Sequence, residues 1–356
     1  MFVRGIGILS VVVLAIAVIS APSGATVWNV STSSQLDAAA AGAQANDTII
    51  CAPGDYYPGH AYYFTVANIT LEGSTSNSNA VRIHGAGMNV NGGGLNNLIQ
   101  FTVGGFTLKN LTVQDVNQNG VQIHGEDNIT SGTIQNVTIM NCGERFIKGS
   151  GPVNQGQYND YNVTVNDCTL EQTIPRSGYA AEDLDYIGGI DVMGTNGWVI
   201  TNNTFENIQG ATGGGRGAVF IWNGTNDTVE NNTIIGCDRG ICLGNPSANI
   251  VAENNIIRGG VYQSGATWTS TNNIIDSTGS TITPAWFTNV ATGDLHLTSA
   301  ATAAIGQGIP LAAVPTDIDG QPRGSTPDIG ADQTVPEPAT MSLLALGTLG
   351  LLCRKR

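Results

Sequence analysis

The sequence predicts an all-β protein built as a right-handed parallel β-helix, and a recurring four-residue phrase is the main reason. In its cleanest copies the phrase is Asn, an apolar residue, Thr and a second apolar residue, and successive copies begin between 18 and 42 residues apart. A drifting period of this size is typical of a solenoid whose coils carry insertions of different length. The copies begin at Asn68, Asn110, Asn136, Asp167, Asn202, Asn231, Asn254 and Asn272.

Apolar residues around the leading Asn indicate a corner between two strands. They stand two residues before it, one after it and three after it, as Ile134, Val137 and Ile139 do around Asn136. Two-residue alternation predicts strands, but here it slips by one residue at the Asn, so the chain must turn there. Asn adopts the left-handed backbone conformation more readily than most other residues with a side chain. We therefore expect a left-handed corner in each coil, with Asn amides stacked and hydrogen-bonded from coil to coil.

The chain divides into five expected segments. Residues 1–25 combine Arg4, an apolar run and a small-residue end, as an export signal peptide does. Residues 26–45 are expected to form an N-terminal cap with a short helix over 33–45, and residues 46–282 the β-helix. Residues 283–333 are expected to form an irregular C-terminal cap, and residues 334–356 a tail with an apolar helix and a basic end. Caps are needed because open solenoid ends expose strand edges and apolar core.

The tail contains a recognisable sorting pattern. It holds Val335-Pro336-Glu337-Pro338-Ala339, an apolar stretch over 341–352 and Arg354-Lys355-Arg356. The stretch is short for a transmembrane helix. The segment resembles the Pro-Glu-Pro tail recognised by bacterial exosortases. That resemblance implies export machinery and exosortase as partners, and transient membrane association through residues 340–353. It also implies release to the cell surface or extracellular matrix of a bacterium with an outer membrane, where such tails accompany exopolysaccharide and biofilm.

The net charge of the chain argues against nucleic acid as a partner. The chain has 13 Lys and Arg against 27 Asp and Glu, and removal of both terminal segments leaves 9 basic and 26 acidic residues, a net charge of −17. We therefore expect no nucleic-acid partner. A polyanionic glycan would need local basic groups or a bridging cation to approach.

Five cysteines remain after tail removal, and an odd number outside the cytoplasm leaves at least one thiol unpaired. Cys142 and Cys237 occupy equivalent positions three coils apart, too far for a bond at about 4.8 Å per coil. We expect the cysteines to be small buried apolar residues. They are Cys51, Cys142, Cys168, Cys237 and Cys242.

A second set of strands aligns between the Asn corners, and alternation predicts two columns of outward side chains on it. Function is expected on this face and on its insertions, because the interior accepts only stacked apolar or small polar side chains. One predicted column is Gln122, Phe146, Asp191, Phe220 and Cys242, and the other is His124, Lys148, Met193, Trp222 and Gly244.

These columns suggest residues for glycan binding. Trp222 and Phe220 are predicted as sugar-stacking platforms, with Arg216, Arg239 and Tyr186 as further glycan-binding residues. The alternative is that Phe220 and Trp222 pack under an insertion. The favoured expectation is an exported surface protein that binds extracellular polysaccharide.

The alternative is a lyase that acts on a uronate-containing glycan by proton abstraction and β-elimination. Lys148 is the candidate base and His124 a weaker one, and the substrate carboxylate would be clamped by Arg145, Arg216 or Arg239, or by a calcium ion. Calcium is the one possible cofactor, held by Asp183, Asp185 and Asp191.

The same residues also fit a hydrolase or a purely structural role. A glycoside hydrolase would pair Asp191 with Asp183 or Asp185 as its two carboxylates. Asp191 and Lys148 are also candidates for a plain ion pair between adjacent coils. In the C-terminal cap, Asp294, Asp317 and Asp319 are further possible calcium ligands.

The stretch 145–260 resembles a group of bacterial right-handed β-helix proteins. Phrases that carry the resemblance include Gly188-Gly189-Ile190-Asp191, Trp222-Asn223-Gly224 and Cys237-Asp238-Arg239-Gly240-Ile241. The resemblance implies binding to, or action on, polysaccharides. In that group His tends to occur where this chain has Met193, and again near Gly217-Ala218, so the departure weakens an enzymatic role that depends on imidazoles.

Overall fold

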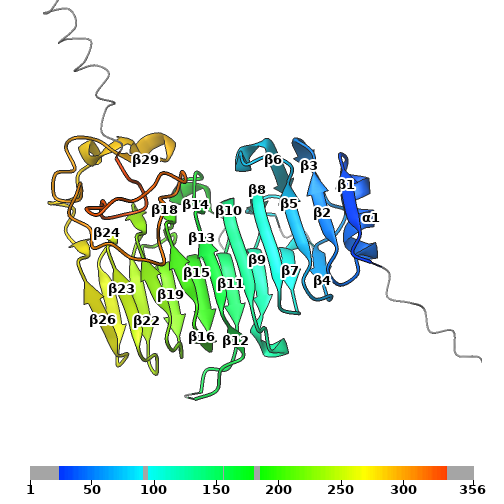
Figure 1. Ribbon diagram of the computed structural model, residues 1–356, viewed down its shortest axis with the longest axis horizontal. Coiled ribbons are helices and arrows are strands. Elements are labelled where there is room, and N and C mark those ends of the chain that lie inside the picture. The colour runs from blue at the N-terminus through cyan, green and yellow to red at the C-terminus, as the bar shows by residue number, and fades with distance from the viewer. Residues whose placement is uncertain (1–23, 91–94, 155, 180–184, 335–356) are drawn as a thin grey trace, which may run out of the picture.

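The computed structural model describes residues 24–90, 95–154, 156–179 and 185–334, and over these residues the chain is an elongated parallel β-helix (Figure 1). Strands pair in parallel from coil to coil, as Ile134 with Val165 and Ile190 with Val219. The predicted fold class is therefore confirmed. The predicted sorting tail beyond Thr334, and the signal peptide up to residue 23, lie outside the described residues.

Two large sheets form the wall of the solenoid. Sheet B has eight strands: β4 (Tyr62–Phe64), β7 (Asn97–Phe101), β9 (Asn119–His124), β11 (Arg145–Ser150), β15 (Gly188–Met193), β19 (Gly217–Trp222), β22 (Ile241–Gly244) and β25 (Val261–Ser264). Sheet A has 17 strands and bends at the Asn corners: β1 (Val27–Val30), β2 (Thr48–Cys51), β3 (Gly54–Tyr56), β5 (Thr70–Gly73), β6 (Val81–His84), β8 (Phe106–Val116), β10 (Gly132–Cys142), β13 (Val163–Asn166), β14 (Thr169–Glu171), β17 (Val199–Thr201), β18 (Thr204–Glu206), β20 (Thr228–Glu230), β21 (Thr233–Ile235), β23 (Ile250–Glu253), β24 (Ile256–Arg258), β26 (Trp268–Thr271) and β27 (Ile274–Asp276).

Shorter elements complete the described chain. β12 (Asp160–Tyr161) pairs in parallel with β16 (Thr195–Asn196), and β28 (Phe287–Asn289) pairs antiparallel with β29 (Asp294–Leu297). Single turns of 3-10 helix are η1 (Ser78–Ala80), η3 (Gly125–Asp127), η4 (Arg176–Gly178), η5 (Pro284–Trp286) and η6 (Val290–Thr292).

All eight predicted corner residues have the left-handed backbone conformation, with φ between 50° and 59°. Their amides also stack. Asn136 Nδ2 donates to Asn110 Oδ1 at 2.8 Å, and Asn272 Nδ2 donates to Asn254 Oδ1 at 2.9 Å. The predicted coil-to-coil hydrogen bonding at the corners is confirmed.

A second row of amides lies inside the solenoid, one residue after the corner. Asn203, Asn232 and Asn255 are fully buried, and Asn273 ends the row. Asn232 Oδ1 accepts hydrogen bonds from the backbone N and the Nδ2 of Asn203, each at 3.0 Å. Because these buried polar groups are hydrogen-bonded, the row fixes the corner geometry without an uncompensated desolvation cost.

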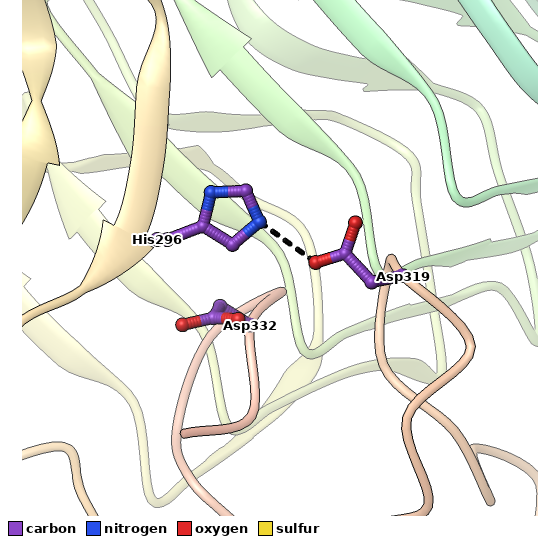
Figure 2. Close-up of side chains that lie close together, drawn as sticks. All are labelled: His296, Asp319 and Asp332. Atoms are coloured by element: carbon purple, nitrogen blue, oxygen red, sulfur yellow. Dashed lines mark hydrogen bonds and ion pairs between the residues drawn. The ribbon is translucent and has the colours of Figure 1, made fainter. Parts of the chain in front are cut away.

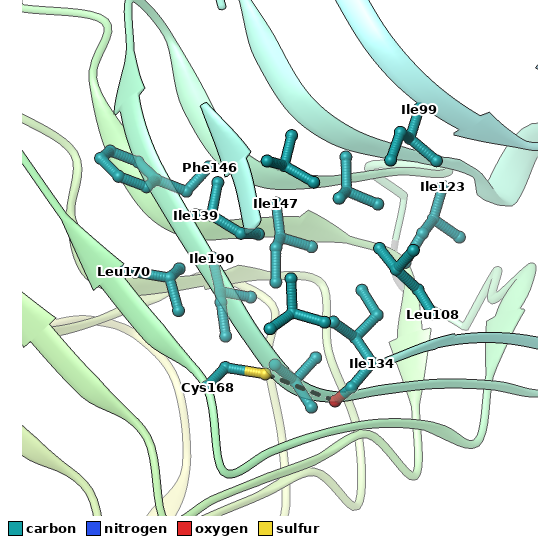
Figure 3. Packing of buried hydrophobic residues seen from close by; sticks show 14 of the residues in the cluster. Ile99, Leu108, Ile123, Ile134, Ile139, Phe146, Ile147, Cys168, Leu170 and Ile190 are labelled. Carbon is teal, nitrogen blue, oxygen red and sulfur yellow. Dashed lines mark hydrogen bonds between the residues drawn. The ribbon is translucent and has the colours of Figure 1, made fainter. Parts of the chain in front are cut away.

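The space between the sheets is filled by stacked Ile, Val and Leu side chains (Figure 3). The five cysteines predicted to be buried are all buried and free. Burial raises the pKa of the Cys168 thiol to about 12, so this group stays protonated and apolar.

The helix predicted over 33–45 is present as α1 (Ser33–Gly42) and closes the N-terminal end. Thr32 caps it, with its hydroxyl accepting from Gln35 N, and Leu36 and Ala39 are buried against the first coil. The sheet begins earlier than the predicted boundary at residue 46, because β1 already pairs with β2. Strand β1 thus lies within the segment that the sequence assigned to the cap.

The C-terminal segment, residues 283–334, folds back along the Asn corners of the last coils (Figure 1). Corner side chains donate to its backbone carbonyls: Asn202 to Thr316, Asn231 to Gly330, Asn254 to Ile309 and Asn272 to Gln307. Arg323 donates in the reverse direction to Asn202 Oδ1 at 3.0 Å. The segment is therefore bound to four coils. Within the described ranges, no helix has both the length and the apolar character that a membrane crossing requires.

Candidate functional site

Sheet B places side chains in columns that run along its outer surface. Cα partners order the first column as Gln100, Gln122, Lys148, Asp191, Phe220, Cys242 and Tyr262. The second contains His124 opposite Ser150, and Met193, Trp222, Gly244 and Ser264 in successive partnership. The predicted columns are thus right for β9, β15, β19 and β22 and wrong for β11, which is displaced by two residues.

As a result, Lys148 takes the place predicted for Phe146, and Ser150 takes the place predicted for Lys148. Lys148 lies between Gln122 and Asp191 in the first column, not beside His124. Phe146 is fully buried and packs near Ile139 in the core (Figure 3). The register pairs the residues on either side of Phe146 but not Phe146 itself, so alternation is interrupted at this corner as well. A shift of two residues preserves alternation, which is why the pattern did not detect it.

Asp191 forms a buried ion pair with Arg145. Arg145 Nε lies 3.0 Å from Asp191 Oδ2, and its Nη1 lies 2.9 Å from Glu144 Oε2. Both Arg145 and Asp191 are nearly fully buried. The expected ion pair between Lys148 and Asp191 is wrong, because Arg145 occupies that carboxylate. The catalytic roles predicted for Arg145 and Asp191 would require this pair to separate.

Aromatic rings and guanidinium groups gather over the ion pair. The Arg145 guanidinium carbon lies 3.1 Å from the centroid of the Tyr186 ring. That of Arg216 lies 5.0 Å from the Tyr186 centroid and 5.2 Å from the Phe220 centroid, within cation–π range. Phe220 stacks on Trp222 with centroids 6.1 Å apart. The structure therefore brings together four of the five residues predicted for glycan binding.

The fifth residue, Arg239, lies one coil further on. Its guanidinium carbon is 5.4 Å from the ring of Tyr262, which follows Phe220 and Cys242 in the first column. Tyr262 is half exposed. The sequence pattern did not indicate Tyr262, because the aligned set of sheet B strands ended at Gly244. We call Tyr186, Arg216, Phe220, Trp222, Arg239 and Tyr262 the aromatic-arginine strip.

Lys148 and His124 lie beside the strip on its N-terminal side. Lys148 is partly exposed, and no ion pair joins it to another residue in the described part of the chain. The His124 ring nitrogens contact Glu126 Oε1 at 2.8 Å and Gln100 Oε1 at 3.1 Å. His124 is therefore held by two partners, whereas the Lys148 ammonium is available at the surface.

The residues predicted to hold calcium on this face have separate partners. Asp183 lies outside the described residues. Asp185 accepts hydrogen bonds from Thr212 and the backbone N of Gly214, and these bonds, those from Thr212 first, hold the pKa of its carboxyl below the usual value. Asp191 is bound to Arg145. A calcium site here stays a prediction.

A second group of carboxylates, missed by sequence reasoning, lies where the C-terminal segment covers sheet A. Glu171 and Glu206 are Cα partners at the ends of β14 and β18. Each stands four residues after its corner residue, Asp167 or Asn202, and this shared offset was a usable signal in the sequence. Burial, with the neighbouring Glu171 charge second, raises the pKa of Glu206 to about 8.

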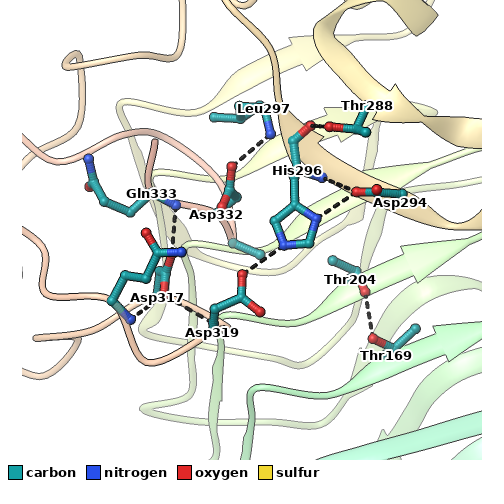
Figure 4. Close-up of polar contacts among 12 residues, drawn as sticks. Thr169, Thr204, Thr288, Asp294, His296, Leu297, Asp317, Asp319, Asp332 and Gln333 are labelled. Atoms are coloured by element: carbon teal, nitrogen blue, oxygen red, sulfur yellow. Dashed lines mark hydrogen bonds and ion pairs between the residues drawn. The ribbon is translucent and has the colours of Figure 1, made fainter. Parts of the chain in front are cut away.

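His296 and Glu171 both line a crevice of about 360 Å³. Its Nδ1 lies 2.6 Å from Asp294 Oδ1 and its Nε2 lies 2.7 Å from Asp319 Oδ2 (Figures 2 and 4). These hydrogen bonds, that from Asp319 first, raise the pKa of His296 to about 10. Of the cap residues predicted as calcium ligands, Asp294 and Asp319 face His296. Asp317 instead accepts from the backbone amides of its own turn.

Family profiles match two parts of this chain. Residues 157–293 match the right handed beta helix region, and residues 334–356 match the PEP-CTERM protein-sorting motif. The chain carries a right-handed β-helix region and a PEP-CTERM sorting signal. The signal implies that the protein is exported, sorted to the cell surface and processed by exosortase. No curated protein sequence matches the chain.

Several solved structures are distantly similar. Alginate lyase AlyF-OU02 in complex with G6 has 13% identity and a TM-score of 0.43, and the match covers 67% of this chain and 57% of that one. Pectate lyase Pel9A has 14% identity and a TM-score of 0.43, with 88% and 97% covered. Pectin methylesterase PemA from Erwinia chrysanthemi has 11% identity and a TM-score of 0.39, with 73% and 91% covered. The chain thus spans little more than half of the alginate lyase, and similarities of this size carry no inference about its chemistry.

Proposed function

We propose that this exported surface protein binds extracellular polysaccharide through the aromatic-arginine strip. The observation that carries the proposal is the grouping of the partly exposed Tyr186, Arg216 and Trp222 around Phe220, which is itself 8% exposed. Flat aromatic rings offer rigid, amphipathic surfaces on which sugar rings stack. Guanidinium groups bind carboxylates in a planar, bidentate manner. A strip that combines both groups suits a glycan with carboxylate substituents.

Local charge supports an anionic glycan as the ligand. The chain without its terminal segments carries a net charge of −17. Arg216 and Arg239 nevertheless lie on the strip, and Lys148 lies beside it in the same column as Phe220. The carboxylate of Asp191 beneath them is paired with Arg145, which also contacts Glu144. The face is therefore less negative than the chain as a whole, and a uronate-containing chain can approach it.

Binding is favoured over catalysis because the groups that a lyase would use are mostly engaged. Arg145 and Asp191 hold each other, and both His124 nitrogens have partners. Lys148 is the one predicted catalytic residue in the described chain that has no ion pair there. A lyase with Lys148 as its base is the alternative function, acting on a uronate-containing glycan by β-elimination.

Affinity electrophoresis of the purified protein in gels with alginate, pectate or the host's own exopolysaccharide tests the proposal. We expect retardation by one glycan. Trp222→Ala should weaken it by about tenfold or more, because a central aromatic side chain typically contributes more than about 1.4 kcal/mol at an interface. Tyr57→Ala is the matched control, since Tyr57 is an exposed aromatic residue outside the strip.

The same samples distinguish binding from cleavage. Glycan of unchanged length and no unsaturated uronate absorbance are expected. If unsaturated uronate absorbance appears and Lys148→Ala abolishes it, the protein acts as a lyase and the binding proposal is refuted. No retardation by any glycan, or equal loss in Trp222→Ala and Tyr57→Ala, would refute the role of the strip.

A further inference from the structure

Among the residues that the structure describes, none is a hydrogen-bond partner of the Glu206 carboxylate. Its side chain is 1% exposed, and neither of its carboxylate oxygens has a hydrogen-bond partner in the described part of the chain. An isolated buried charge is strongly unfavourable, so such a group is expected to be compensated by a cation or to be protonated. This position is separate from the aromatic-arginine strip, since it lies on sheet A beneath the C-terminal segment.

The Glu171 carboxylate points to the same place. A Cβ atom added to Gly293 would lie 3.2 Å from Oε2 of Glu171 and 3.2 Å from Oε2 of Glu206. Gly293 has a φ of 74°, so the turn before β29 passes over both carboxylates without a side chain. Two carboxylates from adjacent sheet strands therefore converge beneath this turn of the C-terminal segment.

Other oxygen donors lie beside the two glutamates. Thr169 and Thr204 precede them by two residues on the same strands, and their hydroxyl groups are 3.1 Å apart (Figure 4). Thr169, Glu171, Thr204 and Gly293 all line the crevice. Carboxylates, hydroxyls and backbone carbonyls form an all-oxygen donor set, which is the set that calcium prefers.

We propose that a calcium ion binds between Glu171 and Glu206, beneath the turn at Gly293. The ion would compensate the partnerless carboxylate of Glu206 and join the turn at Gly293 to β14 and β18. It would thereby add a charged contact to the hydrogen bonds that already hold this segment along the Asn corners. Calcium at this place is independent of glycan binding on sheet B.

A neighbouring group of side chains is the main alternative metal site. One ligand atom from each of His296, Asp319 and Asp332 lies within 4.8 Å of the others (Figure 2). An imidazole with two carboxylates suits zinc better than calcium. His296, however, already has Asp294 and Asp319 as hydrogen-bond partners, and Asp332 accepts from Leu297 N at 2.7 Å. Unlike Glu206, these groups have partners without a metal, so we place the ion at the glutamates.

Isothermal titration of the full chain, purified in detergent and freed of metal with a chelator, tests the site with calcium, magnesium and zinc chlorides. We expect calcium to bind with a dissociation constant on the order of 10⁻⁴ to 10⁻³ M, the range of extracellular modules. Glu206→Gln and Glu171→Gln should each weaken calcium binding at least tenfold. Glu253→Gln, a glutamate of β23 in the same sheet, should leave it unchanged. Calcium should also slow proteolysis of the C-terminal segment in the unmodified chain.

Several outcomes would overturn the proposal. They are the absence of calcium binding by the unmodified chain, undiminished binding by both glutamine variants, and zinc binding that His296→Ala removes while calcium does not bind. Circular dichroism identifies a variant that does not fold. If Glu206→Gln fails in this way, Glu171→Gln decides the question, because Glu171 is partly exposed and its replacement leaves Glu206 in place.

Discussion

Replacing Asn232 with alanine would remove one amide from the buried row inside the corners. The Asn232 side chain makes five hydrogen bonds, all between 2.9 and 3.0 Å. Its Nδ2 donates to the carbonyl oxygens of Ile200 and Glu230 and to Asn255 Oδ1, and its Oδ1 accepts from the N and Nδ2 of Asn203. Asn232 itself has no positive φ, so alanine introduces no backbone strain there.

The expected loss in free energy of unfolding depends on which hydrogen-bonding groups the alanine leaves without a partner. Each hydrogen bond contributes about 0.5–1.5 kcal/mol net, and a buried donor left without an acceptor costs about 1–3 kcal/mol. The backbone N–H of Asn203 would lose its acceptor in a fully buried position, whereas Asn255 Oδ1 keeps the backbone N of Asn232 as a donor. We expect the free energy of unfolding to fall by about 3–5 kcal/mol.

Urea denaturation followed by circular dichroism measures this loss. Asn273→Ala is the control, because Asn273 ends the same row and is partly exposed, so water can replace its hydrogen bonds. We expect it to lose less than half as much stability. A loss below about 1 kcal/mol for Asn232→Ala, or equal losses in both variants, would refute the view that the buried row holds the coils together.

Three further predictions concern charged groups. Asp191→Ala should lower the free energy of unfolding by about 3 kcal/mol, because it leaves the Arg145 guanidinium buried with one carboxylate fewer. Lys148→Ala should change the free energy of unfolding by less than about 0.5 kcal/mol. Urea denaturation of the two variants checks both values. Burial raises the pKa of Asp227 to about 7, above its unfolded value of about 3.9. The folded state therefore holds an extra proton between these values, and the free energy of unfolding falls as pH rises from about 4 to 7. The melting temperature should fall less between pH 5 and pH 8 in Asp227→Asn than in the unmodified protein, and an equal fall would contradict this. Arg323→Ala removes donors to four backbone carbonyls within the C-terminal segment, so limited proteolysis should cleave residues 300–334 while the coils stay intact.

The corners could be predicted from sequence because their cause is local. Each leading Asn or Asp adopts φ near 55° within its own phrase, and the apolar residues beside it are buried in most coils, with Ile275 of the last copy exposed. The helix at the N-terminal end was predictable for a similar reason, since its signals lie within a dozen residues. Neither feature depends on how distant coils are aligned.

Lateral relations between coils were harder to predict. The shift of β11 by two residues keeps every inward side chain inward, so Lys148 was placed correctly on the surface but in the wrong column. The pairing of Arg145 with Asp191 depends on that register and on the ring of Tyr186, which comes from an insertion. A pattern along one strand contains no information about either.

The docking of the C-terminal segment could not be predicted at all. Its hydrogen bonds join residues about 30 to 120 positions apart, such as Asn202 with Thr316 and Arg323. The cover that the turn at Gly293 forms over Glu171 and Glu206 depends on the same docking. The equal offset of the two glutamates from their corners indicated a stacked pair, but only the fold shows that the pair is covered.

Hydroxyl-radical footprinting of the protein with and without its retarding glycan tests the central claim most directly. The account predicts that glycan protects Tyr186, Trp222 and Tyr262 from oxidation and leaves Tyr57, an exposed aromatic residue outside the strip, unprotected. Protection of Tyr57 alone, or protection confined to His296 in the crevice, would contradict glycan binding on sheet B.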